Sequence, residues 1–515
     1  MGNNEKELKA GVILSYLTLA LSNVIALIYT PYMLHMMGQS EYGLYSLVAS
    51  VVAYLTILDF GFGNAIVRFT AKYKAENRET EQYNLFGVFL ILYMLAGVVA
   101  LCIGIGLYLN VDSLFGKSMT FEELEKARIM MLLLIFNLFF TFPLSVFSSI
   151  VTAYERFVFQ KTVNLVRIII QPCIMVPLLF WGYKAIGMVV ITTLLNLVCL
   201  LINCWFCFAR LKIKIYLNKF EWGIIKEIVN YSYFVFLTII VDRAFWSSGQ
   251  FILGIENGTI EVAIFSIAVQ LCMYYMAFSI AISNVFLPKM TRMVACNSST
   301  QEISLLFIKI GRIQYFILGL ILSGFILFGE KFVEYWAGVG YESVYMLTLI
   351  MMIPQTIPLI QNLGISVLQA QNRQKFRSYN NLFFSLLSVV IGFFLSKKYG
   401  SFGVAAAVGG ALLIGHGLIL NLYYSIRIKL DIAKFWREIL KITLLLVCVM
   451  FIFSAINYFI ISEDILFYFL KIVLFICIFA LTFWLWGFNR SEKELIIQPI
   501  SLIHKLLVGK IRRNK

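Results

Sequence analysis

Apolar stretches follow one another along almost the whole chain, and only short polar segments separate them. Many reach 20 residues or more, the length at which an α-helix crosses the roughly 30 Å hydrocarbon layer of a bilayer. A barrel of membrane-spanning strands would show short segments of alternating polarity instead. The pattern therefore predicts an all-α integral membrane protein with about fourteen transmembrane helices. They are expected at residues 11–37, 43–69, 83–109, 127–153, 160–181, 185–209, 224–254, 261–291, 302–328, 344–371, 375–397, 401–428, 434–459 and 464–488.

Composition agrees with this class. Of 515 residues, 61% are hydrophobic and only 13% are charged, and the mean hydropathy is +0.87. A soluble core does not need so much apolar surface. The net charge of +15 would suggest nucleic acid in a soluble protein, but here the positive-inside bias of membrane proteins explains it. We therefore expect membrane lipids, and no nucleic acid, around this chain.

The basic residues set the expected orientation, because they gather in alternate loops while the opposite loops are shorter and more acidic. The basic loops and both termini should face the cytoplasm of a bacterial cytoplasmic (inner) membrane. The first apolar run lacks a small-residue cleavage site and is expected to be a span, not a signal peptide. The basic loops carry Lys72, Lys74 and Arg78; Arg156 and Lys161; Arg210, Lys212, Lys214 and Lys219; Lys289 and Arg292; Arg373, Lys375 and Arg377; and Arg427, Lys429 and Lys434.

The chain also repeats itself in a parallel sense. Gly38, Glu41, Ser46, Tyr54 and Asn64 recur 220 residues later as Gly258, Glu261, Ser266, Tyr274 and Asn284. Ala153, Arg156, Phe159 and Asn164 recur 217 residues later. We predict a six-helix bundle at 1–222, its repeat at 223–430, two further helices at 431–490 and an amphipathic cytoplasmic tail at 491–515. Two such bundles are typical of transporters with a cavity that opens to either side in turn.

Charged residues inside spans are costly and usually face a cavity or a partner. Asp59 lies ~26 Å along its predicted helix from Tyr42, and Arg243 lies at a similar depth beside Asp242, with Gln250 on the same helix. The planar fork of donors on an arginine suits a pyrophosphate or an acidic sugar. The alternative, equally open at this point, is an ion pair of Arg243 with Asp59 or Asp242 that joins the two halves.

Three further residues have a structural explanation that we favour over a functional one. Arg68 and Arg167 lie near the predicted cytoplasmic ends of their helices, where a long side chain reaches water. They could also receive an anionic head group from that side. His416, between Gly415 and Gly417, is the sole histidine in a predicted span. We expect a hydrogen-bonded core histidine, with proton coupling as the alternative.

Enzyme and cofactor chemistry find no support in the sequence. Cys204 and Cys207 lie in an apolar run, where small buried hydrophobes are expected in place of metal ligands. Gly116-Lys117-Ser118 resembles the end of a phosphate-binding loop but has Val111 where that loop requires glycine. No catalytic constellation is present among the few polar groups of the spans. We expect neither an enzyme nor a bound cofactor.

Four segments near the amino terminus resemble the signature of bacterial polysaccharide flippases, the Wzx type of the multidrug, oligosaccharidyl-lipid and polysaccharide exporter superfamily. They are Gly11-Val-Ile-Leu-Ser-Tyr16, Tyr29-Thr-Pro-Tyr32, Gly38-Gln-Ser-Glu-Tyr-Gly-Leu-Tyr-Ser46 and Leu58-Asp-Phe-Gly-Phe-Gly-Asn-Ala-Ile-Val-Arg68. Asn421-Leu-Tyr-Tyr424 is similar to that family as well.

The resemblance implies movement of an undecaprenyl-pyrophosphate-linked oligosaccharide to the outer leaflet by alternating access, for export of O-antigen, capsule or exopolysaccharide. It makes Asp59, Asn64 and Arg68 candidate substrate residues, adds polysaccharide assembly proteins as candidate partners, and leaves coupling to Na⁺, to H⁺ or to neither open. Arg243 and His416 are inferred from their depth alone.

A peptidoglycan-precursor or teichoic-acid flippase would share nearly every feature described so far, so the identity of the substrate stays open. Two functions of other kinds also fit the hydropathy. A multidrug exporter of the same superfamily would favour a carboxylate in its cavity, but the first predicted helix carries no acid. A membrane-embedded polysaccharide polymerase would typically need a large outer loop or a buried catalytic cluster. The internal repeat favours the transporter.

Overall fold

The computed structural model describes residues 2–217, 222–296, 298–371, 373–459, 464–490 and 492–494, and every regular element in these ranges is a helix. Thirteen stretches of this part are long and apolar enough to cross a membrane. The predicted all-α membrane class is therefore confirmed. The count of fourteen stays a prediction, because the two helices expected at 375–397 and 401–428 lie in one 55-residue stretch, Gln374–Ile428.

The chain divides into two compact units, which are described separately. Unit 1 comprises residues 1–270, 334–347 and 381–408, and unit 2 comprises residues 271–333, 348–380 and 409–515. These limits come from the packing of the helices and do not test the predicted halves at 1–222 and 223–430, which stay predictions. Of the tail expected at 491–515, only residues 492–494 lie in the described part.

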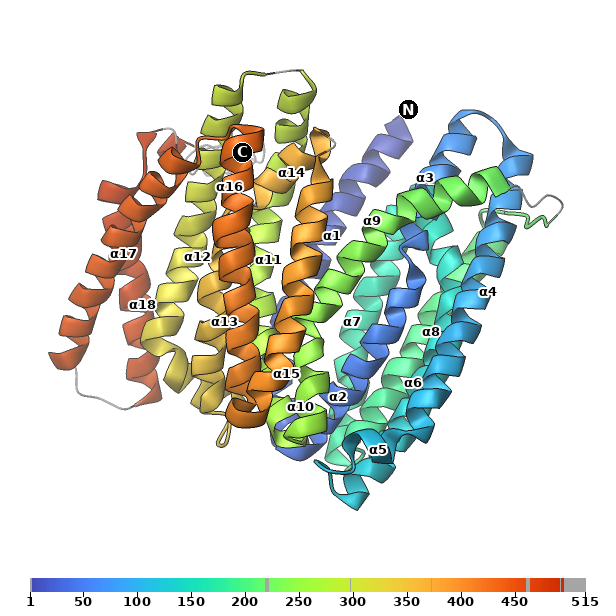
Figure 1. Ribbon diagram of the computed structural model, residues 1–515, viewed down its shortest axis with the longest axis horizontal. Coiled ribbons are helices and arrows are strands. Elements are labelled where there is room, and N and C mark those ends of the chain that lie inside the picture. Colours follow the sequence, from blue (N-terminus) through green and yellow to red (C-terminus); the bar gives the residue numbers. More distant parts are fainter. Residues whose placement is uncertain are drawn as a thin grey trace, which may run out of the picture. The chain divides into compact units, whose positions relative to one another are not determined.

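Unit 1 is built around three long helices that run side by side, α4 (Glu79–Leu109), α6 (Phe121–Ala153) and α8 (Ala185–Ala209) (Figure 1). Helix α1 (Gly2–Met37) packs along α7 (Phe157–Phe180). Aromatic side chains such as Phe69, Phe86 and Phe89 fill the core between α3 (Phe62–Ala75), α4 and α6. These helices form because each apolar run satisfies all its backbone hydrogen bonds internally, as a bilayer requires.

Two hydrogen bonds of unit 1 involve residues that the predicted repeat relates to each other. Glu41 accepts from the backbone N–H of Ala185 at 3.4 Å, where α8 begins. Glu261, its counterpart 220 residues later, accepts from the N–H of Ser401 at 2.9 Å. Ser401 directly follows Gly400, whose φ of 54° kinks α15 (Gln374–Leu412). In both places a carboxylate thus accepts a hydrogen bond from a backbone N–H that has no partner within its own helix. The helix dipole also favours negative charge at this end of a helix.

The span expected at 43–69 lies within the candidate span Gln39–Ala75, but it is not one continuous helix. Helix α2 (Gln39–Leu55) passes into a 3₁₀ turn, η1 (Thr56–Asp59), and the chain restarts as α3. Phe60 and Gly61 between them have φ of 50° and 72°. A Cβ atom on Gly61 would lie 2.3 Å from Cγ1 of Val235. Only glycine therefore permits both the backbone angle and the close approach of α9 (Trp222–Trp246).

Two more expected helices are interrupted. The helix predicted at 224–254 is divided at Ser247 into α9 and α10 (Ser248–Glu256). The helix predicted at 344–371 is divided at Gln361 into α13 (Ser343–Ile360) and α14 (Asn362–Ala370). Interrupted helices at membrane depth expose backbone groups, and they are tolerated where protein or a polar cavity surrounds them.

The other elements are four long α-helices, two short α-helices and three π-helical segments. They are α5 (Val111–Phe115), α11 (Thr259–Ala295), α12 (Thr300–Ala337), η2 (Leu413–Leu420), α16 (Asn421–Tyr423), η3 (Tyr424–Ile428), α17 (Ile432–Phe459), α18 (Ile465–Thr482) and η4 (Phe483–Gly487).

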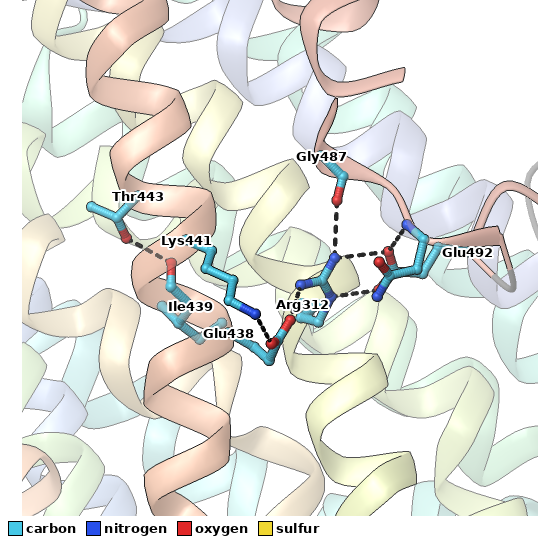
Figure 2. Close-up of polar contacts among 8 residues, drawn as sticks. Arg312, Glu438, Ile439, Lys441, Thr443, Gly487 and Glu492 are labelled. Carbon is cyan, nitrogen blue, oxygen red and sulfur yellow. Dashed lines mark hydrogen bonds and ion pairs between the residues drawn. The ribbon is translucent and has the colours of Figure 1, made fainter. Parts of the chain in front are cut away.

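In unit 2 a buried ion cluster joins α12, α17 and the segment after η4 (Figure 2). Arg312 on α12 is 5% exposed and Glu492 is 2% exposed. The guanidinium donates from Nε and Nη2 to the two oxygens of Glu492 at 2.7 and 3.1 Å, from Nη1 to Glu438 at 2.6 Å, and from Nη2 to the carbonyl of Gly487 at 2.9 Å. The cluster ties the end of the chain's last described helix to α12.

Candidate functional site

The break between α2 and α3 places Asp59 at the end of the 3₁₀ turn η1. Its Oδ1 accepts a hydrogen bond from the phenol of Tyr93 on α4 at 2.5 Å. The carboxyl is half-buried. Tyr93 is a site residue that sequence reasoning missed, because one tyrosine among many aromatic residues carries no distinguishing signal. The hydrogen bond fixes the Asp59 carboxyl within the candidate membrane span Gln39–Ala75, beside the interruption of the helix.

Arg243 meets the same 3₁₀ turn from the last turn of α9. Its Nη2 donates to Oγ1 of Thr56 at 3.1 Å, and its Nε is buried with no hydrogen-bond partner in the described part of the chain. Side chains three residues apart eclipse in a 3₁₀ helix, so Thr56 and Asp59 lie on one face of η1. The ion pair of Arg243 with Asp59 that the sequence left open is not formed between these two described residues.

The remaining residues predicted from the resemblance and from depth lie on the helices around this break. Asn64 and Arg68 are one turn apart on α3 and both are exposed, so they share a face of that helix. Asp242 is exposed on α9. In the orientation that places its amide nitrogen toward the backbone, Gln250 donates to the carbonyl of Ser247 at 2.9 Å. Gln250 on α10 therefore adds a side-chain hydrogen bond to the residue at which α9 and α10 are divided.

Arg167 lies well inside α7, away from its ends, in a polar network that crosses three helices. Its Nη1 donates to Oδ1 of Asn196 on α8 at 3.5 Å. The Asn196 amide in turn donates to Oδ1 of Asn137 and Oγ1 of Thr141 on α6, at 2.9 and 2.8 Å. The two asparagines were missed from the sequence. Their signal was an amide in the middle of an apolar run, which is costly unless it finds a partner.

His416 belongs to unit 2, on the π-helical turn η2, and is 7% exposed. Its backbone carbonyl accepts from the Asn421 amide at 2.8 Å. The choice between a core histidine and a proton-coupling residue stays a prediction.

Unit 2 also holds a small uncharged polar pocket that the sequence did not indicate as a whole. The pocket measures about 190 Å³ and lies between α11 and α14. Its polar lining consists of amides and hydroxyls only: Ser283, Asn284, Asn362, Ser366 and Gln369. Ile280, Leu287 and Ile365 form the apolar part of the lining.

The pocket is held in shape by a buried glutamine on α12. The Gln314 amide donates to the hydroxyls of Ser279 and Ser283 at 3.1 and 2.7 Å, and Asn362 donates to Ser279 at 3.0 Å. Asn284 is the counterpart of Asn64 in the repeat. Neutral donors and acceptors of this kind suit a neutral polar ligand.

Comparison with known proteins identifies the family. A family model described as polysaccharide biosynthesis protein matches residues 8–294. A putative O-antigen transporter of Shigella flexneri is 21% identical over 414 residues, which cover 78% of this chain and 94% of that protein.

Two solved structures share the fold. The lipid II flippase MurJ in an inward closed conformation aligns with a TM-score of 0.72 at 14% identity, over 92% of this chain and 97% of that one. An inward-facing multidrug resistance MATE family transporter of the MOP superfamily aligns with a TM-score of 0.60 at 15% identity, over 81% of this chain and 96% of that one.

These matches confirm the expected resemblance. The similar proteins are named as transporters and flippases, which agrees with the prediction of a transporter in place of an enzyme. The match to the family model extends over more than half of the sequence. The chain therefore belongs to the polysaccharide biosynthesis protein family, has the helices of a multi-pass membrane protein and shares its fold with the MurJ flippase and MATE transporter structures.

Proposed function

We propose that this protein moves an undecaprenyl-pyrophosphate-linked oligosaccharide from the cytoplasmic to the outer leaflet by alternating access. The observation that carries the proposal is the interrupted α2–α3 helix, where Arg243 meets η1 at membrane depth with a buried Nε that lacks a partner. An unpartnered guanidinium N–H in an apolar surrounding is costly, and an anionic ligand removes that cost. The O-antigen transporter among the similar proteins supports the same class of substrate.

Arg243 would hold the pyrophosphate through its planar donor fork, as arginine does with phosphate oxygens generally. Arg68 and Asn64 on the exposed face of α3 would add a charge and an amide to the path of the head group. Arg167, Asp242 and Gln250 stay candidate residues of this path. Lysine at position 243 would keep the charge but lose the fork, so it should restore only part of the activity.

Asp59 supplies a physical route to ion coupling. Its carboxylate lies on the same face of η1 as Thr56, the partner of Arg243. A negative charge there opposes an incoming pyrophosphate. Binding of a proton or Na⁺ by Asp59 would remove this repulsion. The cation would then raise the affinity for the pyrophosphate, and the pyrophosphate would raise the affinity for the cation. His416 is the second candidate for ion coupling.

The glycan and the lipid need surroundings of different polarity. Sugar hydroxyls would lose their hydrogen bonds in hydrocarbon and need polar groups in place of water. Beside the break in unit 1, a cavity of about 350 Å³ is lined by Phe60, Phe62, Tyr233 and Phe236, together with Val229 and Ser232. Its aromatic walls suit an apolar isoprenoid segment close to the head group.

The direct test is deletion of the gene, with lipid-linked oligosaccharide then quantified on each leaflet and drug susceptibility measured alongside. The flippase predicts accumulation on the cytoplasmic leaflet, loss of surface glycan and unchanged drug susceptibility. Unchanged lipid intermediates with new drug sensitivity would instead support the multidrug exporter, the second candidate, which the MATE fold favours.

A further inference from the structure

A cavity of about 480 Å³ opens between the amino-terminal ends of α12 and α17, both within unit 2. By the predicted orientation these helix ends face the cytoplasm. The cavity is separate from the interrupted helices, the amide-lined pocket and the Arg312 cluster, and the proposed function makes no use of it.

Two lysines give the cavity its charge. Lys429 and Lys434 line it and are exposed, and neither forms an ion pair with a described residue. The one acid in the lining, Asp431, is already engaged, because its Oδ1 accepts from the backbone N–H of Lys434 at 2.9 Å and caps the start of α17. The lining therefore carries a net charge of +1 with both ammonium groups available.

Uncharged donors complete the polar end. Ser304 on α12 is 5% exposed, and its Oγ accepts from the N–H of Asp431 at 3.2 Å. Its hydroxyl hydrogen remains available for an acceptor in the cavity. The side chains of Thr300 and Gln301 also line this end. Phosphate oxygens are acceptors only, so a cavity that offers ammonium, hydroxyl and amide donors matches them.

The opposite edge of the cavity is apolar. Leu305, which is 54% exposed, and Ile308 line it one turn further along α12. Arg312, one more turn along the same helix face, pairs with Glu438 and does not line the cavity (Figure 2). The α12 side of the lining thus changes from polar at Thr300 and Gln301 to apolar at Leu305 and Ile308, in the direction from the helix start toward the predicted bilayer interior.

We propose that this cavity binds the phosphate head group of an anionic phospholipid, with an acyl chain lying over Leu305. A free phosphate ion would use the polar end only and would leave the exposed leucine without a partner. A zwitterionic head group would gain little, because its own cation opposes Lys429 and Lys434.

The test is a titration of the purified full-length protein in detergent with phosphatidylglycerol and with phosphatidylcholine, with bound lipid counted by native mass spectrometry. The test variant is Lys429→Gln with Lys434→Gln. The matched control is Lys289→Gln with Lys375→Gln, two exposed lysines of the same unit and the same predicted side that do not line the cavity. Each cation near an anionic head group is worth about fivefold in affinity, so the test pair should weaken phosphatidylglycerol binding about 30-fold.

The proposal also requires that the control pair binds phosphatidylglycerol as the unmodified protein does, and that inorganic phosphate at millimolar concentration fails to displace the lipid. Leu305→Asn should weaken phosphatidylglycerol binding as well, because it removes the apolar edge. Equal binding of the two lipids, equal effects of the test and control pairs, or full displacement by inorganic phosphate would each overturn the proposal. The thermal unfolding temperature without added lipid should be the same for all variants. A lower unfolding temperature of the test variant than of the control variant would contradict the proposal that Lys429 and Lys434 act by binding the lipid head group.

Discussion

Substitution of Glu492 by glutamine tests whether the buried Arg312 cluster anchors the segment after η4. The change removes one negative charge from a carboxylate that is 2% exposed and accepts two N–H groups of Arg312. Breaking a buried ion pair by removing one partner costs about 3–5 kcal/mol. Arg312 keeps Glu438 at 2.6 Å, so the lower end, about 3 kcal/mol, applies.

The assay is amide hydrogen exchange in the full-length protein. The N–H of Asn489 donates to Glu492, and the N–H of Phe488 donates to the carbonyl of Phe483. A loss of about 3 kcal/mol raises local opening, and therefore the exchange of these amides, about 100-fold. Glu494→Gln is the matched control, because Glu494 lies in the same turn and is exposed.

A paired substitution separates charge from packing. Arg312→Met with Glu492→Met removes both charges and leaves Glu438 with Lys441 at 2.6 Å. This pair should exchange more slowly than Glu492→Gln alone, because it leaves no buried charge without a partner. Exchange in Glu492→Gln equal to that in Glu494→Gln would refute the reasoning.

Three further predictions concern the fold of unit 1. Gly61→Ala should lower the free energy of unfolding by about 2 kcal/mol, because it adds a Cβ at positive φ against a neighbouring side chain. Thermal unfolding measures this effect. The control Gly106→Ala, with open space around the added Cβ, should not lower the transition temperature. Thr120→Ala should cost about 1 kcal/mol in the same assay by removing the capping box of α6, and an unchanged transition would contradict that role. Glu261→Gln should speed amide exchange at Ser401, whose N–H the carboxylate accepts; unaltered exchange there would show that the repeated contact adds no stability.

The spans could be predicted from the sequence because hydropathy depends on composition summed over many residues. Hydropathy over about 20 residues identifies a helix wherever it lies in the bilayer. The repeat was visible through matched residues such as Glu41 and Glu261, whose hydrogen bonds to helix starts the structure then revealed.

The interruptions could not be predicted in the same way. Phe60 and Gly61 are as apolar as their neighbours, and their left-handed backbone depends on the approach of Val235 from a distant helix. A single glycine in a membrane helix is common, so it does not indicate a break by itself. Thr56 accepts a hydrogen bond from Arg243 because the interruption places it in the 3₁₀ turn η1. This contact could therefore not be predicted from the sequence either.

The polar clusters were missed for a different reason. Arg312 and Glu438 both lie inside predicted spans, so the rule that charges in spans need a partner applied to them as it did to Arg243. Glu492 was assigned to the tail, and its place beside Arg312 depends on the turn after η4. Sequence alone indicates that such charges need partners without indicating which partners they find.

The most direct test of the central claim is a leaflet assay with purified protein in vesicles that contain a lipid-linked oligosaccharide, with the fraction accessible to an external glycosidase measured over time. The control is Lys226→Gln, at an exposed lysine of the same helix α9. The account predicts that the unmodified protein and Lys226→Gln both make the inner-leaflet pool accessible to the enzyme. Arg243→Gln should do so at least tenfold more slowly, because a charged hydrogen bond is worth about 1.5–3 kcal/mol. Equal rates for Arg243→Gln and the unmodified protein would contradict the account.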